Sequence, residues 1–221
     1  MMHELLIVAH ILIIGYWLGT DLAVYYISGA IVDADKPTPV RVFAAKAMLL
    51  LDMVPRTALI LTLLTGLSLA GARWLPGDLI AVWWLWPLLL AWLALTWTVF
   101  RLEHSALGHQ LARIDFAFRV LVVLVCFGLA VALVTGLGSF AVLPWLGGKL
   151  AIMGLIIALG LLIRIQLKPF GPLFGQVAQG QADASTEAQL RRLIAQVKVP
   201  VWIIWVSLIV AAVLGHLKPG F

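Results

Sequence analysis

The sequence predicts an all-α protein, a polytopic membrane bundle of about six transmembrane helices in which residues 1–221 form a single domain. Apolar residues make up 63% of the 221 residues, charged residues make up only 11%, and the mean hydropathy is +1.09. Soluble domains contain about 45–50% apolar and about 25% charged residues. This composition excludes a soluble enzyme. It also excludes an intrinsically disordered chain, which requires low hydrophobicity and high net charge.

Six apolar runs are close to the length of about 20 residues that a helix needs to cross a bilayer. They cover residues 5–32, 44–72, 79–101, 116–142, 143–165 and 199–216. The first run has no basic segment before it and no clear cleavage site after it, so we expect a retained span rather than a signal peptide. The fourth and fifth runs abut, and we expect the turn between them near residues 138–144. Thr65-Gly66 and Thr135-Gly136 each predict a helix end followed by a tight turn, a faint sign of a duplicated hairpin.

The longest polar stretch precedes the sixth run. Residues 169–182 are rich in Gly, Pro and Gln, which predicts a loop. In residues 185–197, Ser185 is suited to cap a helix, and apolar side chains recur on one face. We expect a short interfacial helix there, with Arg191 and Arg192 facing lipid headgroups.

The distribution of Lys and Arg predicts the orientation in the membrane, because basic residues favour the cytoplasmic side. Eleven basic residues follow the first, third and fifth runs, and three lie on the other side. The eleven are Lys36, Arg41, Lys46, Arg101, Arg113, Arg119, Arg164, Lys168, Arg191, Arg192 and Lys198; the three are Arg73, Lys149 and Lys218. Both termini are therefore expected in the periplasm of a bacterium, with the protein in its inner membrane. The formal net charge of +5 then reflects topology, and no nucleic-acid partner is expected.

One face of the first run carries a stripe of residues spaced for a helix. The stripe consists of His10, Ile14, Trp17 and Asp21. Gly15 and Gly19 lie roughly opposite, at a spacing that permits close packing of another helix. An ionisable residue at membrane depth is a candidate for function, so His10 is interpreted as a ligand. The alternative is that both faces are packed interfaces and that His10 bonds to a neighbouring backbone.

Two further charged residues lie inside the second run. Asp52 and Arg56 share a helix face, and Pro55 between them is expected to bend the helix. Asp21 lies at a matching depth, which predicts one cluster of Asp21, Asp52 and Arg56. The cluster either fixes two helices in register as an ion pair, or brings Arg56 into proton transfer or contact with a cofactor propionate.

Two basic residues lie near the same side of the membrane as His10. Lys149 is close to the depth of His10 and is also placed to snorkel to headgroups. His216 ends the sixth run and is either interfacial or a second metal ligand beside His10. Cys126 is the single cysteine, which excludes an intrachain disulfide, and no HExxH motif or Cys/His zinc spacing occurs.

Several of these residues resemble a known family. His10 followed by Trp17-Leu18-Gly19 resembles the first helix of the CopD and HemJ-type protoporphyrinogen oxidase superfamily of small membrane haem proteins. Thr135-Gly136 and residues 145–150, Trp-Leu-Gly-Gly-Lys-Leu, are similar to its Thr-Gly and Trp-Leu-x-x-Lys-Leu signature. Residues 190–219 are similar to its last helix. The resemblance implies a b-type haem near one membrane face, with His10 as an axial ligand and Lys149 close to the haem.

The sequence also departs from the oxidase pattern. Val197-Lys198 stands where the pattern has Asn-Glu, Ile163-Arg164 stands where it has Tyr-His, and six spans exceed the usual four. These departures concern the oxidase activity more than the haem-binding scaffold. We therefore expect a protein that binds haem b and has an electron-transfer or oxidoreductase role, with quinone or another membrane redox partner. The residues expected around the cofactor are His10, Lys149, His216, Ile14, Trp17 and Arg56, with His10 and His216 as the metal ligands.

Two other functions remain open at this point. A non-catalytic scaffold or assembly subunit of a larger membrane complex would use its tryptophan-rich faces as homo- or hetero-oligomer surfaces. Copper handling of the CopD kind is the other, although the five methionines show no repeated spacing. A secondary transporter ranks below both, because Pro55 is a single helix break and such proteins use a pair at the midplane.

Overall fold

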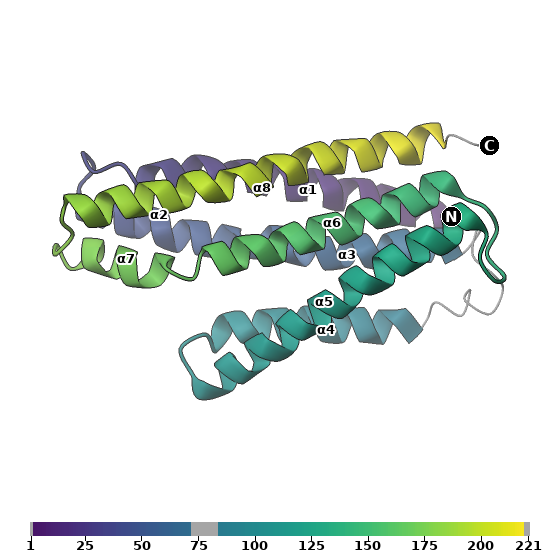
Figure 1. Ribbon diagram of the computed structural model, residues 1–221, viewed down its shortest axis with the longest axis horizontal. Helices are drawn as coiled ribbons and strands as arrows, with labels where there is room; N and C mark the ends of the chain where they lie inside the picture. The colour runs from purple at the N-terminus through teal and green to yellow at the C-terminus, as the bar shows by residue number, and fades with distance from the viewer. Residues whose placement is uncertain (1, 72–83, 219–221) are drawn as a thin grey trace.

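The computed structural model describes residues 2–71 and 84–218, and within these ranges the chain is all-α, with no β-strand. Eight helices run through the described residues (Figure 1). They are α1 (Met2–Ile31), α2 (Thr38–Leu51), α3 (Met53–Gly71), α4 (Leu85–Arg101), α5 (Ala106–Thr135), α6 (Pro144–Gln166), α7 (Phe170–Ala178) and α8 (Ala184–Leu217).

Five stretches of helix are long and apolar enough to cross a membrane: α1, α2 with α3, α5, α6 and α8. Helix α4 is apolar but has 17 residues in the described part of the chain. The predicted third span began at residue 79, and residues 79–83 lie outside the described residues. The protein is thus an all-α polytopic membrane bundle, and both termini lie at the same end of it (Figure 1). We call this the terminal end.

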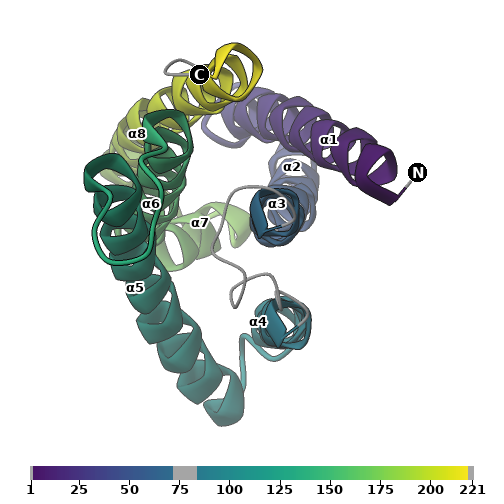
Figure 2. The same cartoon turned by 90° about the vertical axis from the view of Figure 1, so that its right-hand side faces the viewer.

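The long helices form a ring when the bundle is viewed along its length (Figure 2). Neighbouring helices pack in the order α1, α3, α4, α5, α6, α8 and back to α1. The main core fills the ring with side chains such as Trp17, Ile60, Trp92, Ile157 and Trp205. Polar groups that project inward from the ring must therefore find partners among these helices.

The second span is broken near its middle. Helix α2 ends at Leu51 and α3 begins at Met53, with Asp52 between them. Pro55 has no backbone N–H, so the carbonyl of Leu51 loses the helical donor it would otherwise have. The bend expected from Pro55 is therefore found as a one-residue interruption.

The turn between α5 and α6 lies where the sequence predicts it. Helix α5 ends at Thr135, and Gly136 follows as the C-cap with φ of 70°, a conformation that favours glycine. Helix α6 begins at Pro144. The matching expectation for Thr65-Gly66 is wrong, because α3 continues through this pair to Gly71.

The predicted loop at residues 169–182 is also wrong over most of its length. Residues Phe170–Ala178 form α7. The side chains of Phe170, Leu173 and Phe174 pack against a buried cluster that includes Ile31 and Leu190. This tertiary burial outweighs the low helix propensity of the glycines and prolines in the segment.

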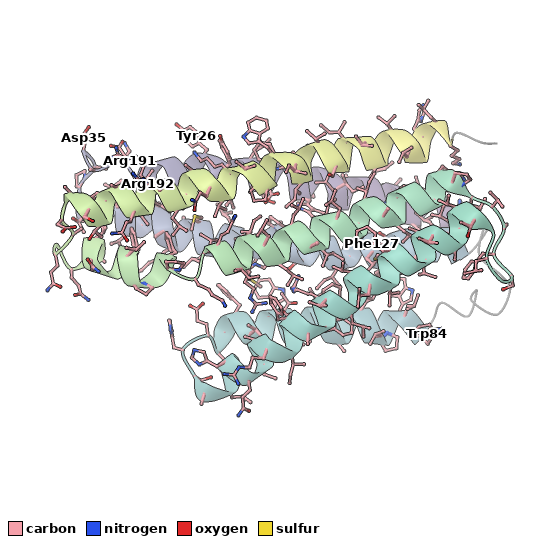
Figure 3. The ribbon with its side chains drawn as sticks, in the orientation of Figure 1. Tyr26, Asp35, Trp84, Phe127, Arg191 and Arg192 are labelled. Atoms are coloured by element: carbon pink, nitrogen blue, oxygen red, sulfur yellow. The ribbon has the colours of Figure 1, made fainter. Side chains whose placement is uncertain are left out.

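The expected interfacial helix is not separate from the last span. Helix α8 runs unbroken for 34 residues from Ala184, with Pro200 inside it. Asp183 is the N-cap rather than Ser185, and its side chain accepts a 2.7 Å hydrogen bond from the Thr186 N–H. This hydrogen bond lowers the pKa of the Asp183 carboxyl. Arg191 and Arg192 project from the outside of the bundle near the end opposite the termini (Figure 3).

One ion pair holds that opposite end together. Arg41 is 4% exposed and pairs through both terminal nitrogens with the carboxylate of Glu187, each at 2.8 Å. Its Nε donates to the carbonyl of Ile31 at the end of α1, also at 2.8 Å. Arg41 was counted among loop residues from the sequence, but it connects α1, α2 and α8.

Candidate functional site

His10 lies between α1 and α3 near the terminal end. Its Nδ1 is 2.8 Å from Oγ1 of Thr65. The Thr65 hydroxyl in turn donates to the carbonyl of Leu61 at 2.8 Å, one helical turn earlier. The imidazole is thus bonded to a side chain of the neighbouring helix, and not to backbone as the alternative reading of the sequence had it.

The contact with Thr65 links the tautomer of His10 to the direction of the Thr65 hydroxyl. A threonine hydroxyl carries one proton, and its neighbours here are the carbonyls of Leu61 at 2.8 Å and Thr62 at 3.3 Å and Nδ1 of His10. When the proton goes to a carbonyl, the Thr65 oxygen accepts from an Nδ1–H of His10, and Nε2 then carries a lone pair. Among the described residues, Nε2 has no hydrogen-bond partner. A histidine held through one nitrogen with the other free is the arrangement found in metal-ligating histidines.

Glycine makes this approach of α1 to α3 close. A Cβ at Gly66 would lie 3.2 Å from Cε1 of His10, tighter than an ordinary contact. The imidazole therefore lies directly over the Thr65-Gly66 pair. The Thr65-Gly66 pair, which the sequence had suggested as a helix end, instead provides the hydrogen-bond partner of His10 and the space for its ring.

Lys149 reaches the same end of the bundle from α6. Its Nζ lies only 2.7 Å from where a Cβ of Gly215 on α8 would be, so the amine rests on that glycine. Lys149 is also close enough to His10 for the two side chains to interact electrostatically. Four helices, α1, α3, α6 and α8, thus contribute to the surroundings of His10 and Lys149.

Three other predicted site residues have different surroundings. Trp17 is 3% exposed and lies in the main core. Ile14 is half-buried one turn from His10. His216 is exposed at the end of α8. On the Gly15 and Gly19 face of α1, a Cβ added at either glycine would have no other part of the described chain within 4 Å.

Of the predicted cluster of Asp21, Asp52 and Arg56, only Asp52 and Arg56 are bonded to each other. Arg56 forms an ion pair with Asp52 through Nε, at 2.8 Å, and through a terminal nitrogen. Asp21 accepts a 3.3 Å hydrogen bond from Nε1 of Trp205 and interacts electrostatically with Asp52. Arg56 lies nine residues before Thr65, about 14 Å along α3. It is therefore on a different level of the bundle from His10.

A second charged cluster was missed from the sequence. Asp115 of α5 is 2% exposed, and its Oδ2 accepts from Arg119 at 2.9 Å and from Arg164 of α6 at 2.7 Å. Its Oδ1 accepts from Nε1 of Trp92 at 3.0 Å. Arg119 also bonds to Thr96 and lies over the Trp92 ring at 5.1 Å. We refer to Asp115, Arg119 and Arg164 as the Asp115 cluster.

The sequence did carry a signal for this cluster. Asp115 and Arg119 are four residues apart, the spacing of a same-face pair on a helix. Asp115 was placed just before the fourth run and Arg119 near its start, whereas α5 begins ten residues before that run, at Ala106. Arg119 and Arg164 were therefore counted as loop charges, although each lies within a long helix.

Comparison with protein-family models, with curated proteins and with solved structures finds no match to this chain.

Proposed function

We propose that this protein binds haem b through His10 and serves electron transfer or a related oxidoreduction in the bacterial inner membrane. The observation that supports the proposal is the His10–Thr65 hydrogen bond, because it orients the imidazole through Nδ1 and leaves Nε2 without a partner among the described residues. Neutral imidazole is a common axial ligand of haem iron. The resemblance of His10 and residues 145–150 to the CopD and HemJ-type proteins points to the same cofactor.

The residues around His10 fit this role. Thr65 supplies the outer hydrogen bond that holds a ligating histidine in one orientation. Lys149 brings a positive charge to the same level from α6, which suits a group that carries carboxylates. The bound cofactor would supply the one-electron redox chemistry. The helices would ligate it, exclude water and set its electrostatic surroundings.

The described residues around His10 do not include a second histidine that could be an axial ligand. His216 is exposed at the end of α8, and among the described residues no three His, Cys, Asp or Glu side chains come together as a metal site. Arg56 is paired with Asp52 and lies about 14 Å along α3 from the level of His10, so it is not expected to contact a haem bound at His10.

The test is an absorption spectrum of the full-length protein, purified from haem-supplemented bacteria in mild detergent and reduced with dithionite. The proposal predicts a Soret band with sharp α and β bands. A colourless protein with the thermal unfolding of a folded helical bundle would contradict it.

One observation favours a second candidate function, a scaffold subunit of a larger complex. Tyr16 is 70% exposed and Tyr26 is 84% exposed on α1, and a Cβ at Gly15 or Gly19 of the same helix would meet open space. Such a face permits close approach of another helix. A haem-free protein that purifies in a stable complex of fixed stoichiometry would favour this alternative.

A further inference from the structure

We propose that the Asp115 cluster and the groove beside it form a binding site for one anionic phospholipid. The phosphate would lie against Arg164 and Arg119, and an acyl chain would lie in the groove between α5 and α6. This site is separate from His10, and its ligand does not depend on haem.

The charges of the cluster do not cancel. Two guanidinium groups share the single carboxylate of Asp115, which leaves a net charge of +1. Both carboxylate oxygens are already occupied, Oδ2 by the two arginines and Oδ1 by Trp92. An unbalanced positive charge at the edge of a hydrocarbon layer favours an anionic partner.

Arg164 has donors to offer such a partner. A guanidinium has five N–H groups, and within the described residues Arg164 donates one hydrogen bond, to Asp115. Its side chain is 29% exposed, whereas that of Arg119 is 11% exposed and is held by Asp115, Thr96 and Trp92. Arg164 is therefore the residue best placed to bind a phosphate, and Arg119 adds charge from a fixed position.

An apolar groove of about 300 Å³ begins at the level of this cluster. Its walls include Phe116 and Ile165, the chain neighbours of Asp115 and Arg164. From there it continues toward the terminal end between α5 and α6. Its other walls include Val120, Leu124, Ala158 and Leu162. A groove with this lining suits an acyl chain.

The level of the cluster matches that of lipid headgroups. Arg119 and Arg164 lie 16 and 20 residues from Thr135 and Pro144, the ends of α5 and α6 at the terminal end. At a rise of about 1.5 Å per residue these separations are about 24 and about 30 Å. The hydrocarbon core of a bilayer is about 30 Å thick. A lipid whose phosphate binds the cluster would therefore have its chain pointing into the hydrocarbon layer, along the groove.

The experiment compares binding of phosphatidylglycerol and phosphatidylcholine, with identical acyl chains, to the delipidated full-length protein by native mass spectrometry. We expect one phosphatidylglycerol to bind at least about tenfold more tightly than phosphatidylcholine. Arg164→Gln should abolish this preference. Ala158→Phe, which fills the groove without changing charge, should weaken both lipids. Arg113→Gln removes an exposed charge from α5, the helix of Asp115 and Arg119, and should change neither.

Three results would overturn the proposal. They are equal binding of the two lipids to the wild-type protein, equal losses in Arg164→Gln and Arg113→Gln, and lipid binding that Ala158→Phe leaves unchanged. Inorganic phosphate that displaces the lipid fully at millimolar concentration would also contradict it, since the acyl chain would then contribute nothing. If Arg164→Gln unfolds, Ala158→Phe still decides the question.

Discussion

The hydroxyl oxygen of Thr65 lies 2.8 Å from Nδ1 of His10, although 55 residues separate the two in the chain. This contact joins α1 to α3 and gives the imidazole a fixed orientation. Gly66 beside it allows the two helices to come this close. The proposed haem ligand therefore depends on a partner from another helix.

Thr65→Val should weaken haem binding while the fold remains intact. Valine keeps the shape of threonine but removes the oxygen that accepts from Nδ1, and loss of such an outer hydrogen bond typically costs about 10–100-fold in affinity. Haem titration of the purified apoprotein measures the change. The matched control is Thr62→Val on the same helix, because Oγ1 of Thr62 is buried without a partner among the described residues. Equal affinities in the two variants would refute the role of Thr65.

Asp115→Ala should destabilise the protein more than any change to the Asp52–Arg56 pair. It leaves the guanidinium groups of Arg119 and Arg164 without their carboxylate, and breaking a buried pair costs about 3–5 kcal/mol. Asp52→Ala should cost less, because the side chains of Arg56 and Asp52 are 40% and 33% exposed. Thermal unfolding in detergent compares the two variants. A lower midpoint for Asp52→Ala than for Asp115→Ala would contradict the assignment.

Arg41→Ala should loosen the end of the bundle opposite the termini. It removes two hydrogen bonds to Glu187 and one to the carbonyl of Ile31. Hydrogen bonds to charged groups are worth about 1.5–3 kcal/mol, so we expect a local loss of about 2 kcal/mol. Faster hydrogen exchange in α7 and in the first turns of α8 would report it. Arg192→Ala removes an exposed charge from α8 and should leave exchange there unchanged.

Both termini should lie in the periplasm. The structure places them at one end of the bundle (Figure 1), and the excess of basic residues at the other end favours the cytoplasm there. A reporter that is active only in the periplasm, fused after Phe221, should be active. The same reporter inserted at residues 102–105, between α4 and α5, should be silent. The reverse pattern would place His10 and Lys149 on the cytoplasmic side.

Composition and run length predicted the bundle because the bilayer imposes a minimum length of apolar helix. They did not predict α7, since that helix is stabilised by packing on Ile31 and Leu190 and not by lipid. The helix at residues 185–197 was predicted, but as separate from the last span. Helical spacing found His10 but did not show that Trp17 lies in the core. Contacts between distant helices, such as Arg164 with Asp115, leave no periodic pattern in a single sequence.

The central claim is that His10 binds haem, and the haem-to-protein ratio of His10→Ala tests it most directly. The ratio is measured from the pyridine haemochrome spectrum of wild-type, His10→Ala and His216→Ala proteins purified in parallel. We predict that His10→Ala retains less than about a tenth of the wild-type haem and keeps its helical content and thermal midpoint, since the imidazole is the ligand and Thr65 only orients it. His216→Ala, whose side chain is exposed, should retain the full amount. A His10→Ala protein with wild-type haem content and an unaltered spectrum would contradict the account.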